Sequence, residues 1–240
     1  MIRTLPVLFL LLLAASSATA QGVSFSDALP QGPGLREGPV LWPSVAVLAG
    51  VAAALPSRPP EPTFVGPVGW SVGADVKLNI GHDVAVGLRY LMTRFGPNDA
   101  SAGRQEPLPQ YQIFLQYLYD EVTIHEILAL AEVPFVNTAL LRWSGLAGIG
   151  VGLEQVHMRQ YDAQDKNGDG VPESEPVLRQ LVKRQDTGPA FTLGTSLAFF
   201  PADWLSLGLT VQASYRYSPN LSLEEGALSL HGLFSTEGHF

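Results

Sequence analysis

The stretch that decides the fold is the last one, Leu228-Ser-Leu-His-Gly-Leu-Phe-Ser-Thr-Glu-Gly-His-Phe240. Successive side chains of a strand point to opposite faces, so every second residue shares a face. The alternation here predicts a strand with one mostly apolar face and one mostly polar face, closing on an aromatic residue. The apolar set is Leu228, Leu230, Gly232, Phe234, Thr236, Gly238 and Phe240, and the other set is Ser229, His231, Leu233, Ser235, Glu237 and His239.

The same alternation recurs upstream of this stretch. It is clearest on both sides of Gly81-His-Asp83, where two alternating runs around a tight turn predict a hairpin. Eight strands result, at 42–55, 69–80, 84–95, 110–135, 139–158, 188–199, 204–217 and 227–240. The connections between them are alternately long and short, at 56–68, 81–83, 96–109, 136–138, 159–187, 200–203 and 218–226. This alternation places both ends of the chain at the same end of the set of strands, the end with the short connections.

Two of these strands have alternatives. The segment 42–55 is rich in alanine, and its second face is small rather than polar, so a short helix competes with a strand. The segment 110–135 is either one long strand that projects beyond its neighbours or two strands with a turn at Asp120-Glu121. One strand keeps the long and short connections alternating, and we therefore predict one.

Composition limits the class of protein. The 240 residues include no cysteine, which excludes disulfides, thiol catalysis and a lipoprotein anchor. The net charge of −8 argues against nucleic acid as a partner. Charged residues make up 15% of the chain, against about 25% in soluble domains, yet no apolar run reaches the ~18 residues of a membrane helix. Apolar residues spread over alternating positions are typical of a barrel.

The N-terminus predicts export. Arg3 precedes the apolar run Leu5–Ala15, and Ala18-Thr-Ala20 fits the small-x-small pattern of a cleavage site before Gln21. The expected organisation is a signal peptide at 1–20, a periplasmic lead-in at 21–41 and a barrel domain at 42–240. An uncleaved anchor is the alternative.

The stretches Gly69–Phe95, Glu126–Glu154 and Thr187–Phe240 together resemble the small outer-membrane β-barrel family of the OmpA-transmembrane-domain, OmpX and PorT-like types. The resemblance implies an all-β fold, an eight-stranded antiparallel up-and-down transmembrane β-barrel with a filled lumen. It implies a place in the outer membrane of a Gram-negative bacterium, in contact with outer-membrane lipid. It also implies insertion by the barrel-assembly machinery, with Phe240 as part of the assembly signal.

Charged residues on the inward faces are the first candidate site. An eight-stranded barrel is just wide enough for side chains to fill it, and charges inside it need partners. We expect a structural ion-pair network that plugs the lumen, with a gated ion path as the alternative. The nine residues are Asp75, Lys77, Arg89, Glu126, Glu132, Arg142, Glu154, Arg216 and Glu237.

Aromatic residues gather at the predicted strand ends and indicate two interfacial girdles. A platform for sugar or peptide is the alternative. One end has Phe199, Phe200, Trp143, Trp204 and Phe240, and the other has Trp70, Phe95, Tyr215 and Tyr217.

The stretch Asp165-Lys-Asn-Gly-Asp-Gly-Val-Pro-Glu173 is a candidate calcium loop, because alternating oxygen donors followed by glycine suit a hard cation. Its ligands would be Asp165, Asn167, Asp169, the carbonyl of Val171 and Glu173. The twelfth loop position is Pro176, so the bidentate glutamate is missing, and a plain turn competes. Apart from weak calcium here, we expect no cofactor.

Catalysis has little support. Ser229 and His231 share a face, with Glu237 further along, but no nucleophile motif surrounds them. We therefore predict a non-enzymatic barrel with a structural or surface-interaction role, whose outer loops meet an unknown extracellular partner. The alternatives are a small pore or transporter, a lipid-modifying barrel enzyme and a soluble periplasmic β-protein.

Overall fold

The computed structural model describes residues 41–55, 65–80, 84–97, 104–108, 111–167, 169, 171, 173–202, 204–217 and 227–240. The predicted signal peptide lies outside these residues, as does the lead-in except for Leu41. Among the described residues, no helix is long and apolar enough to cross a membrane.

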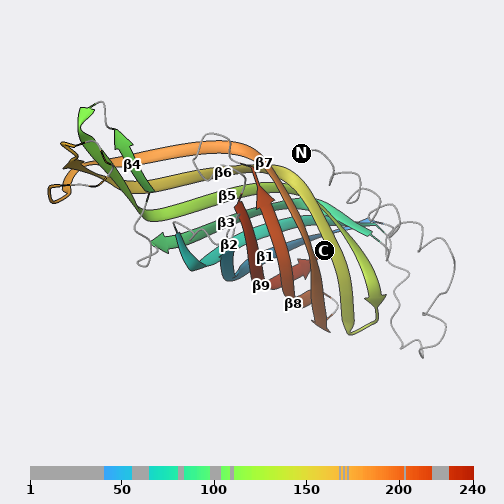
Figure 1. The fold of residues 1–240 in the computed structure, drawn as a ribbon. Coiled ribbons are helices and arrows are strands. Elements are labelled where there is room, and N and C mark those ends of the chain that lie inside the picture. The colour runs from blue at the N-terminus through green and yellow to red at the C-terminus, as the bar shows by residue number, and fades with distance from the viewer. Residues whose placement is uncertain are drawn as a thin grey trace. The chain divides into compact units, whose positions relative to one another are not determined.

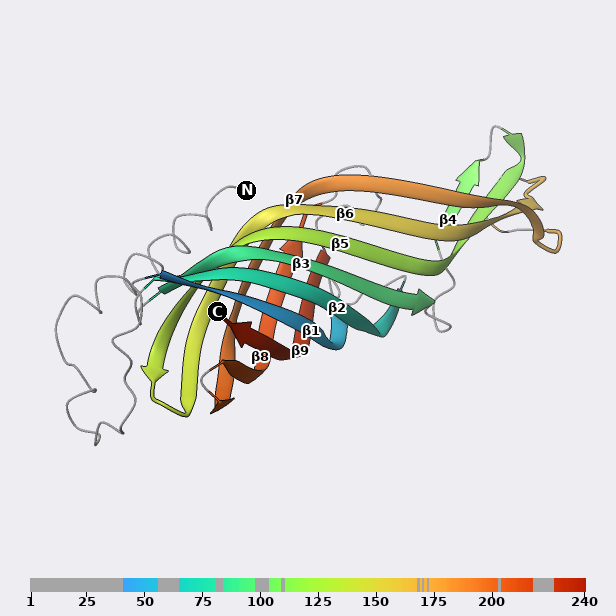
Figure 2. The same cartoon turned by 180° about the vertical axis from the view of Figure 1, so that it is seen from behind.

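Nine strands make up the described chain, and eight of them form a closed ring (Figures 1 and 2). Neighbours in the ring are antiparallel, and most follow one another in sequence; the ring closes through β1 with β9 and through β3 with β5. The fold is therefore an eight-stranded up-and-down barrel, as predicted. The strands are β1 (Leu41–Leu55), β2 (Val65–Ile80), β3 (Val84–Pro97), β4 (Arg104–Leu108), β5 (Ile113–Asn137), β6 (Leu141–Gln164), β7 (Val177–Ala202), β8 (Leu205–Arg216) and β9 (Ala227–His239).

The first predicted strand is confirmed. β1 pairs with β9 from Ser44↔His239 to Leu55↔Leu228, so it supplies the seam that closes the ring. Its inward residues from Ser44 to Ala52 are small except for Leu48, which packs against Leu91 and Leu233. The small inward face explains why the polar alternation was weak in this segment.

Three strands extend beyond the ring. β5, β6 and β7 have 25, 24 and 26 residues, whereas the other ring strands have 12 to 16. β3 pairs with β5 only as far as Phe95↔Val122, and β8 with β7 only as far as Arg216↔Ala190. Beyond these residue pairs, away from the ring, β5, β6 and β7 continue as a sheet. β4 pairs with the free edge of β5 in this sheet. We call β4 with residues 113–121, 157–164 and 177–189 the projecting sheet (Figure 1).

The projecting sheet corrects two predicted loops. The segment 159–187 is mostly strand, with only residues 165–176 between β6 and β7, and the segment 96–109 contains β4. β2 also begins at Val65, inside the predicted loop 56–68. The prediction of one strand at 110–135 is confirmed, and the ladder shifts register between Tyr119 and Glu121, where a bulge replaces the alternative turn.

The outward face of the ring is apolar. Exposed apolar side chains from all eight ring strands form what we call the outer belt. Most of the predicted girdle aromatics are exposed at its edges, but Phe95 is buried inside and Phe200 packs against His239. The outer belt contains Val45, Val47, Val51, Trp70, Val72, Val76, Leu78, Val86, Leu88, Tyr90, Ile127, Val133, Ile149, Val151, Phe191, Leu193, Leu197, Leu207, Leu209, Val211, Leu230 and Phe234.

Candidate functional site

The lumen holds a buried arginine–aspartate pair. Asp75 on β2 lies directly opposite Arg89 on β3, and both side chains are almost wholly buried, at 1% and 4% exposure. Arg89 donates from Nε to Oδ1 at 2.7 Å and from Nη2 to Oδ2 at 2.6 Å, a bidentate pair. Its Nη1 donates to Gln212 on β8, so the pair crosses the interior.

A second group joins two glutamates to one arginine. Arg216 of β8 lies 3.0 Å from Glu154 of β6 and 3.9 Å from Glu126 of β5. Gly152 makes room for this arginine, because a Cβ built at Gly152 would lie 2.6 Å from Cδ of Arg216. The group is flanked by the apolar cluster Leu128, Leu130 and Ala190.

A third group lies nearer the end of the barrel that carries the short turns, which we call the short-turn end. Nζ of Lys77 is 2.8 Å from Glu237 and 3.3 Å from Glu132. The free oxygens of both carboxylates accept further bonds, Glu237 from Ser44 and Glu132 from Ser196 at 2.9 Å. One ammonium therefore bridges β5 and β9.

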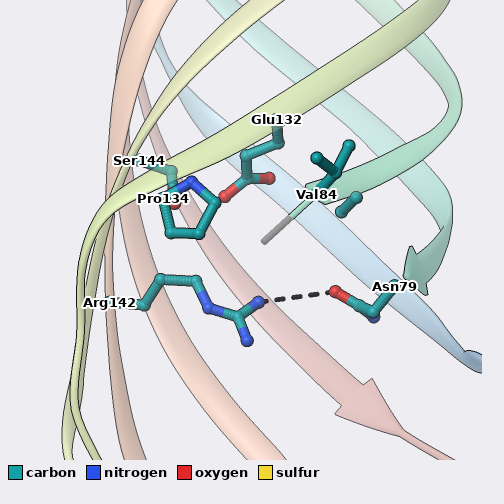
Figure 3. Close-up of a pocket in the computed structure, with 7 residues that line it drawn as sticks. Asn79, Val84, Glu132, Pro134, Arg142 and Ser144 are labelled. Carbon is teal, nitrogen blue, oxygen red and sulfur yellow. Dashed lines mark hydrogen bonds between the residues drawn. The ribbon is translucent and has the colours of Figure 1, made fainter. Parts of the chain in front are cut away.

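Arg142 lies at the same end and makes weaker contacts. Its Nη1 donates to Asn79 Oδ1 at 3.4 Å, and its guanidinium lies 5.4 Å from the centre of the Phe200 ring. Both Arg142 and Asn79 line a pocket with an empty volume of about 200 Å³ (Figure 3). The other lining residues are Val84, Ala85, Glu132, Pro134 and Ser144.

The structure thus places all nine predicted charges inside the ring and brings eight of them into the three groups. Sequence reasoning missed the neutral partners of these charges and the apolar layers between them. The largest apolar layer lies toward the projecting sheet. The only sequence signal for it is that its residues occupy the inward positions of their strands. It contains Ala52, Phe95, Leu115, Tyr117, Tyr119, Val122, Ile124, Val156 and Met158.

Of the three residues weighed for catalysis, the structure brings two together. Ser229 Oγ and His231 Nε2 are 2.8 Å apart, while His231 Nδ1 lies 3.2 Å from Ser71. Glu237 is bound instead to Lys77 and Ser44. His231 is therefore flanked by hydroxyl groups on both sides, inside the filled lumen.

The candidate calcium loop joins β6 to β7 at the tip of the projecting sheet. Asp169 Oδ1 accepts from the amide of Val171 at 2.8 Å, and Glu173 accepts from the amide of Lys166 at 3.1 Å. Asn167 and Asp169 bond to each other at 3.0 Å. Within the described ranges, no three His, Cys, Asp or Glu side chains are grouped so that they could hold a metal ion.

The projecting sheet carries two ion pairs between neighbouring strands. Arg159 lies 2.7 Å from Asp120, and Arg179 lies 2.6 Å from Asp162. The hydrogen bond to Asp120 and the charge of that carboxylate raise the pKa of the Arg159 guanidinium.

At the opposite end, the backbone of Phe240 donates to Pro43 at 3.1 Å and its ring is exposed.

No protein-family model matches the chain, and no curated protein matches it. Solved structures with similar folds include a major outer membrane protein from Thermus thermophilus, at 11% identity over 83% of this chain and 99% of that chain, with a TM-score of 0.46. Neisserial surface protein A is similar at 12% identity, over 85% and 100%, with a TM-score of 0.45. Ail, the attachment invasion locus protein of Yersinia pestis, is similar at 14% identity, over 82% and 98%, with a TM-score of 0.43.

Proposed function

We propose that this chain is a non-enzymatic barrel of the Gram-negative outer membrane, which holds the projecting sheet outside the cell for contact with an extracellular partner. The observation that carries the proposal is the outer belt. Monomeric soluble proteins rarely expose contiguous apolar patches larger than a few hundred Å², whereas here apolar side chains surround the ring. A closed ring also leaves no strand edge in lipid, which is what a membrane requires of β-structure.

The outer belt can be tested by one charge placed in two environments. Val211 lies near the middle of β8 in the outer belt, and Leu181 lies on the projecting sheet with 75% of its side chain exposed. Arginine near a bilayer midplane costs a barrel ~2–4 kcal/mol. In lipid vesicles, we expect Val211→Arg to lower the free energy of unfolding in urea by this amount and Leu181→Arg by less than ~1 kcal/mol. Equal losses would contradict the membrane assignment.

The orientation of the barrel in the outer membrane can be tested by labelling single cysteines. The chain has no cysteine of its own, so an introduced one is the only thiol to react. A single cysteine at Leu181 would report the projecting sheet, and one at Trp204, exposed at the short-turn end, serves as the matched control. With a maleimide too large to pass outer-membrane pores, we expect Leu181→Cys to react on intact cells. Trp204→Cys should react only after the outer membrane is opened. The reverse order would place the projecting sheet in the periplasm.

A lipid-modifying enzyme is the second candidate, and the Ser229–His231 hydrogen bond of 2.8 Å is the observation that favours it. Release of fatty acid from phospholipid vesicles by the refolded protein, lost in Ser229→Ala, would support that candidate. We expect no release, because both side chains are buried among lumen residues.

For the loop between β6 and β7 we propose weak calcium binding, supported by the spacing of Asp165, Asn167 and Asp169. The hydrogen bonds within the loop must rearrange before the oxygens can converge, so we expect a Kd of ~10⁻³ M or weaker. Calorimetric titration with calcium measures it, with Asp169→Asn as the variant and magnesium as the control ion. No calcium-specific heat would leave the loop a plain turn.

A further inference from the structure

One edge of the projecting sheet is formed by β7. β8 pairs with β7 only from Ala190 onward, so no strand of the described chain pairs with that edge of β7 between Val177 and Gly188. We call the edge of residues 177–188 the open edge, and Figures 1 and 2 show β7 along this margin of the sheet. An unpaired strand edge is a row of backbone donors and acceptors with which another extended chain can pair.

The register of β7 fixes which backbone groups face the open edge. Tyr217 donates its N–H to the carbonyl of Pro189 at 3.1 Å, so residue 189 turns its carbonyl toward the β8 side. In an antiparallel sheet, the N–H and C=O of one residue point to the same side of the strand, and those of the next residue point to the other. The pairing with β6 is regular over 180–189, so every second residue shares the orientation of Pro189. These residues are Leu181, Lys183, Gln185 and Thr187.

One of these four donors is already used. The N–H of Thr187 donates to Oδ1 of Asp186 at 2.9 Å. Leu181, Lys183 and Gln185 therefore present the donors and acceptors that a new strand would meet.

The side chains along the open edge are basic and apolar. Residues 177–188 include three cations and one carboxylate, in a chain whose net charge is −8. Lys183 is exposed, and no carboxylate pairs with it among the described side chains. Arg184 lies over the ring of Tyr117 and also has no carboxylate partner in the described ranges. Leu181 is 75% exposed.

The order of these side chains selects a sequence in the partner. Leu181 and Lys183 lie on one face of β7, and Val182 and Arg184 lie on the other. Side chains directly opposite each other on paired strands are stabilising when their charges are opposite or when both are apolar. An antiparallel partner would therefore place two acidic residues opposite 184 and 183, followed by two apolar residues opposite 182 and 181.

We propose that the open edge of β7 binds an extended segment of an extracellular protein by strand addition, and that this segment has two acidic residues followed by two apolar ones. This inference rests on the proposed function, because it supplies the chemistry of the extracellular partner. A second copy of this chain fits poorly. Two paired β7 edges would bring Lys183 and Arg184 of both copies together, and like charges on facing strands are destabilising.

A short peptide tests the proposal. The probe is a fluorescein-labelled peptide with the sequence Thr-Glu-Glu-Val-Val-Thr, and its control is Thr-Lys-Lys-Val-Val-Thr. Each would be titrated with the refolded full chain in lipid nanodiscs and followed by fluorescence anisotropy, with empty nanodiscs as the blank. We expect saturable binding of the acidic peptide and none of the basic one. Equal binding of both peptides, or of neither, would overturn the proposal.

Backbone methylation separates strand addition from attraction between charges. Methyl groups on the amides of the second glutamate and second valine would replace the donors that face β7, and we expect binding to weaken by at least about tenfold. Methyl groups on the first glutamate and first valine would point away from β7 and should change the affinity by less than about twofold. Equal effects of the two patterns would refute strand addition.

Two charge reversals locate the site on the protein. Lys183→Glu should weaken binding of the acidic peptide about tenfold. Lys166→Glu makes the same change of charge in the loop between β6 and β7, away from the open edge, and should leave the affinity within about twofold. The same loss in both variants would mean that only net charge matters. Cross-linked dimers joined through β7 would instead make a second copy the occupant and would overturn the proposal.

This experiment fails independently of the proposed function. A chain that passes the Val211→Arg test but does not bind the peptide would reject the open edge as the binding site and leave the membrane assignment intact.

Discussion

Individual charged residues in this barrel are held by geometry that neighbouring strands set. Asp75 and Arg89 face each other because β2 and β3 are antiparallel neighbours whose register pairs these two residues. The pair is buried, so each charge depends on the other to offset the loss of water. Arg94 and Glu121 also form an ion pair, but half of the Arg94 side chain is exposed, and water screens that pair.

This contrast predicts unequal costs for two similar substitutions. Asp75→Asn leaves the buried guanidinium of Arg89 without its counter-charge and should lower the free energy of unfolding by ~3–5 kcal/mol. Glu121→Gln removes the partner of Arg94 and should cost less than ~1 kcal/mol. Urea unfolding in lipid vesicles, followed by tryptophan fluorescence, measures both. Similar losses would mean that the lumen pair is as well hydrated as the surface pair.

At the scale of elements, the weakest sequence signal belongs to the strand that closes the ring. β1 meets β9 closely at Gly50, where a built Cβ would lie 1.9 Å from the carbonyl oxygen of Gly232. The absence of a side chain is therefore what lets the two strands pair at this point. Gly96, near the end of β3, has no atom within 4 Å of such a Cβ.

Alanine at these two glycines should behave differently. Gly50→Ala forces the backbone of β9 away and should lower the free energy of unfolding by ~1–3 kcal/mol, the usual cost of overpacking. Gly96→Ala should change it by less than ~0.5 kcal/mol, as for ordinary surface substitutions. The same vesicle unfolding experiment compares them, and a Gly50→Ala barrel as stable as the native one would show that the seam can open without cost.

The ring elements could be predicted from sequence because the outer belt imposes an apolar side chain at alternate positions. That rule ends where the belt ends. In the projecting sheet, Arg179, Lys183 and Gln185 occupy strand positions of β7 that lie beyond the outer belt. Polar residues at such positions resemble those of a loop, so the sequence pattern predicts a loop there. The nine lumen charges could be assigned by parity, but their partners could not. Which cation meets which carboxylate depends on how the strands are staggered around the ring, as for Lys77 and Glu132, 55 residues apart.

Within the described chain, buried ion pairs and apolar side chains share the interior of the ring. Three groups of ion pairs and the apolar cluster around Phe95 and Ile124 occupy it. An eight-stranded ring has little room beyond its own side chains. A pocket lined by Arg142 and Asn79 lies at the short-turn end.

Because side chains occupy the interior of the ring, we expect the barrel not to conduct ions. In a planar bilayer, we expect the refolded protein to show no steady, reproducible conductance steps, because ions would have to displace paired charges and cross apolar layers. A heat-dependent shift on a denaturing gel would show that the sample is folded. Regular openings from such a sample would mean that the layers separate in the membrane, and the pore alternative would then replace the structural one.

The continuity of β5, β6 and β7 has a mechanical consequence. These strands pass from the ring into the projecting sheet without a break, and β6 is paired along both edges from Arg142 to Asp162. A pull on the tip would run along the strands, at right angles to their interstrand hydrogen bonds, and would load many of those bonds in shear at once. Peeling, which breaks such bonds one after another, would require a sideways force. We therefore expect the projecting sheet to resist a force that pulls it along its strands, away from the ring.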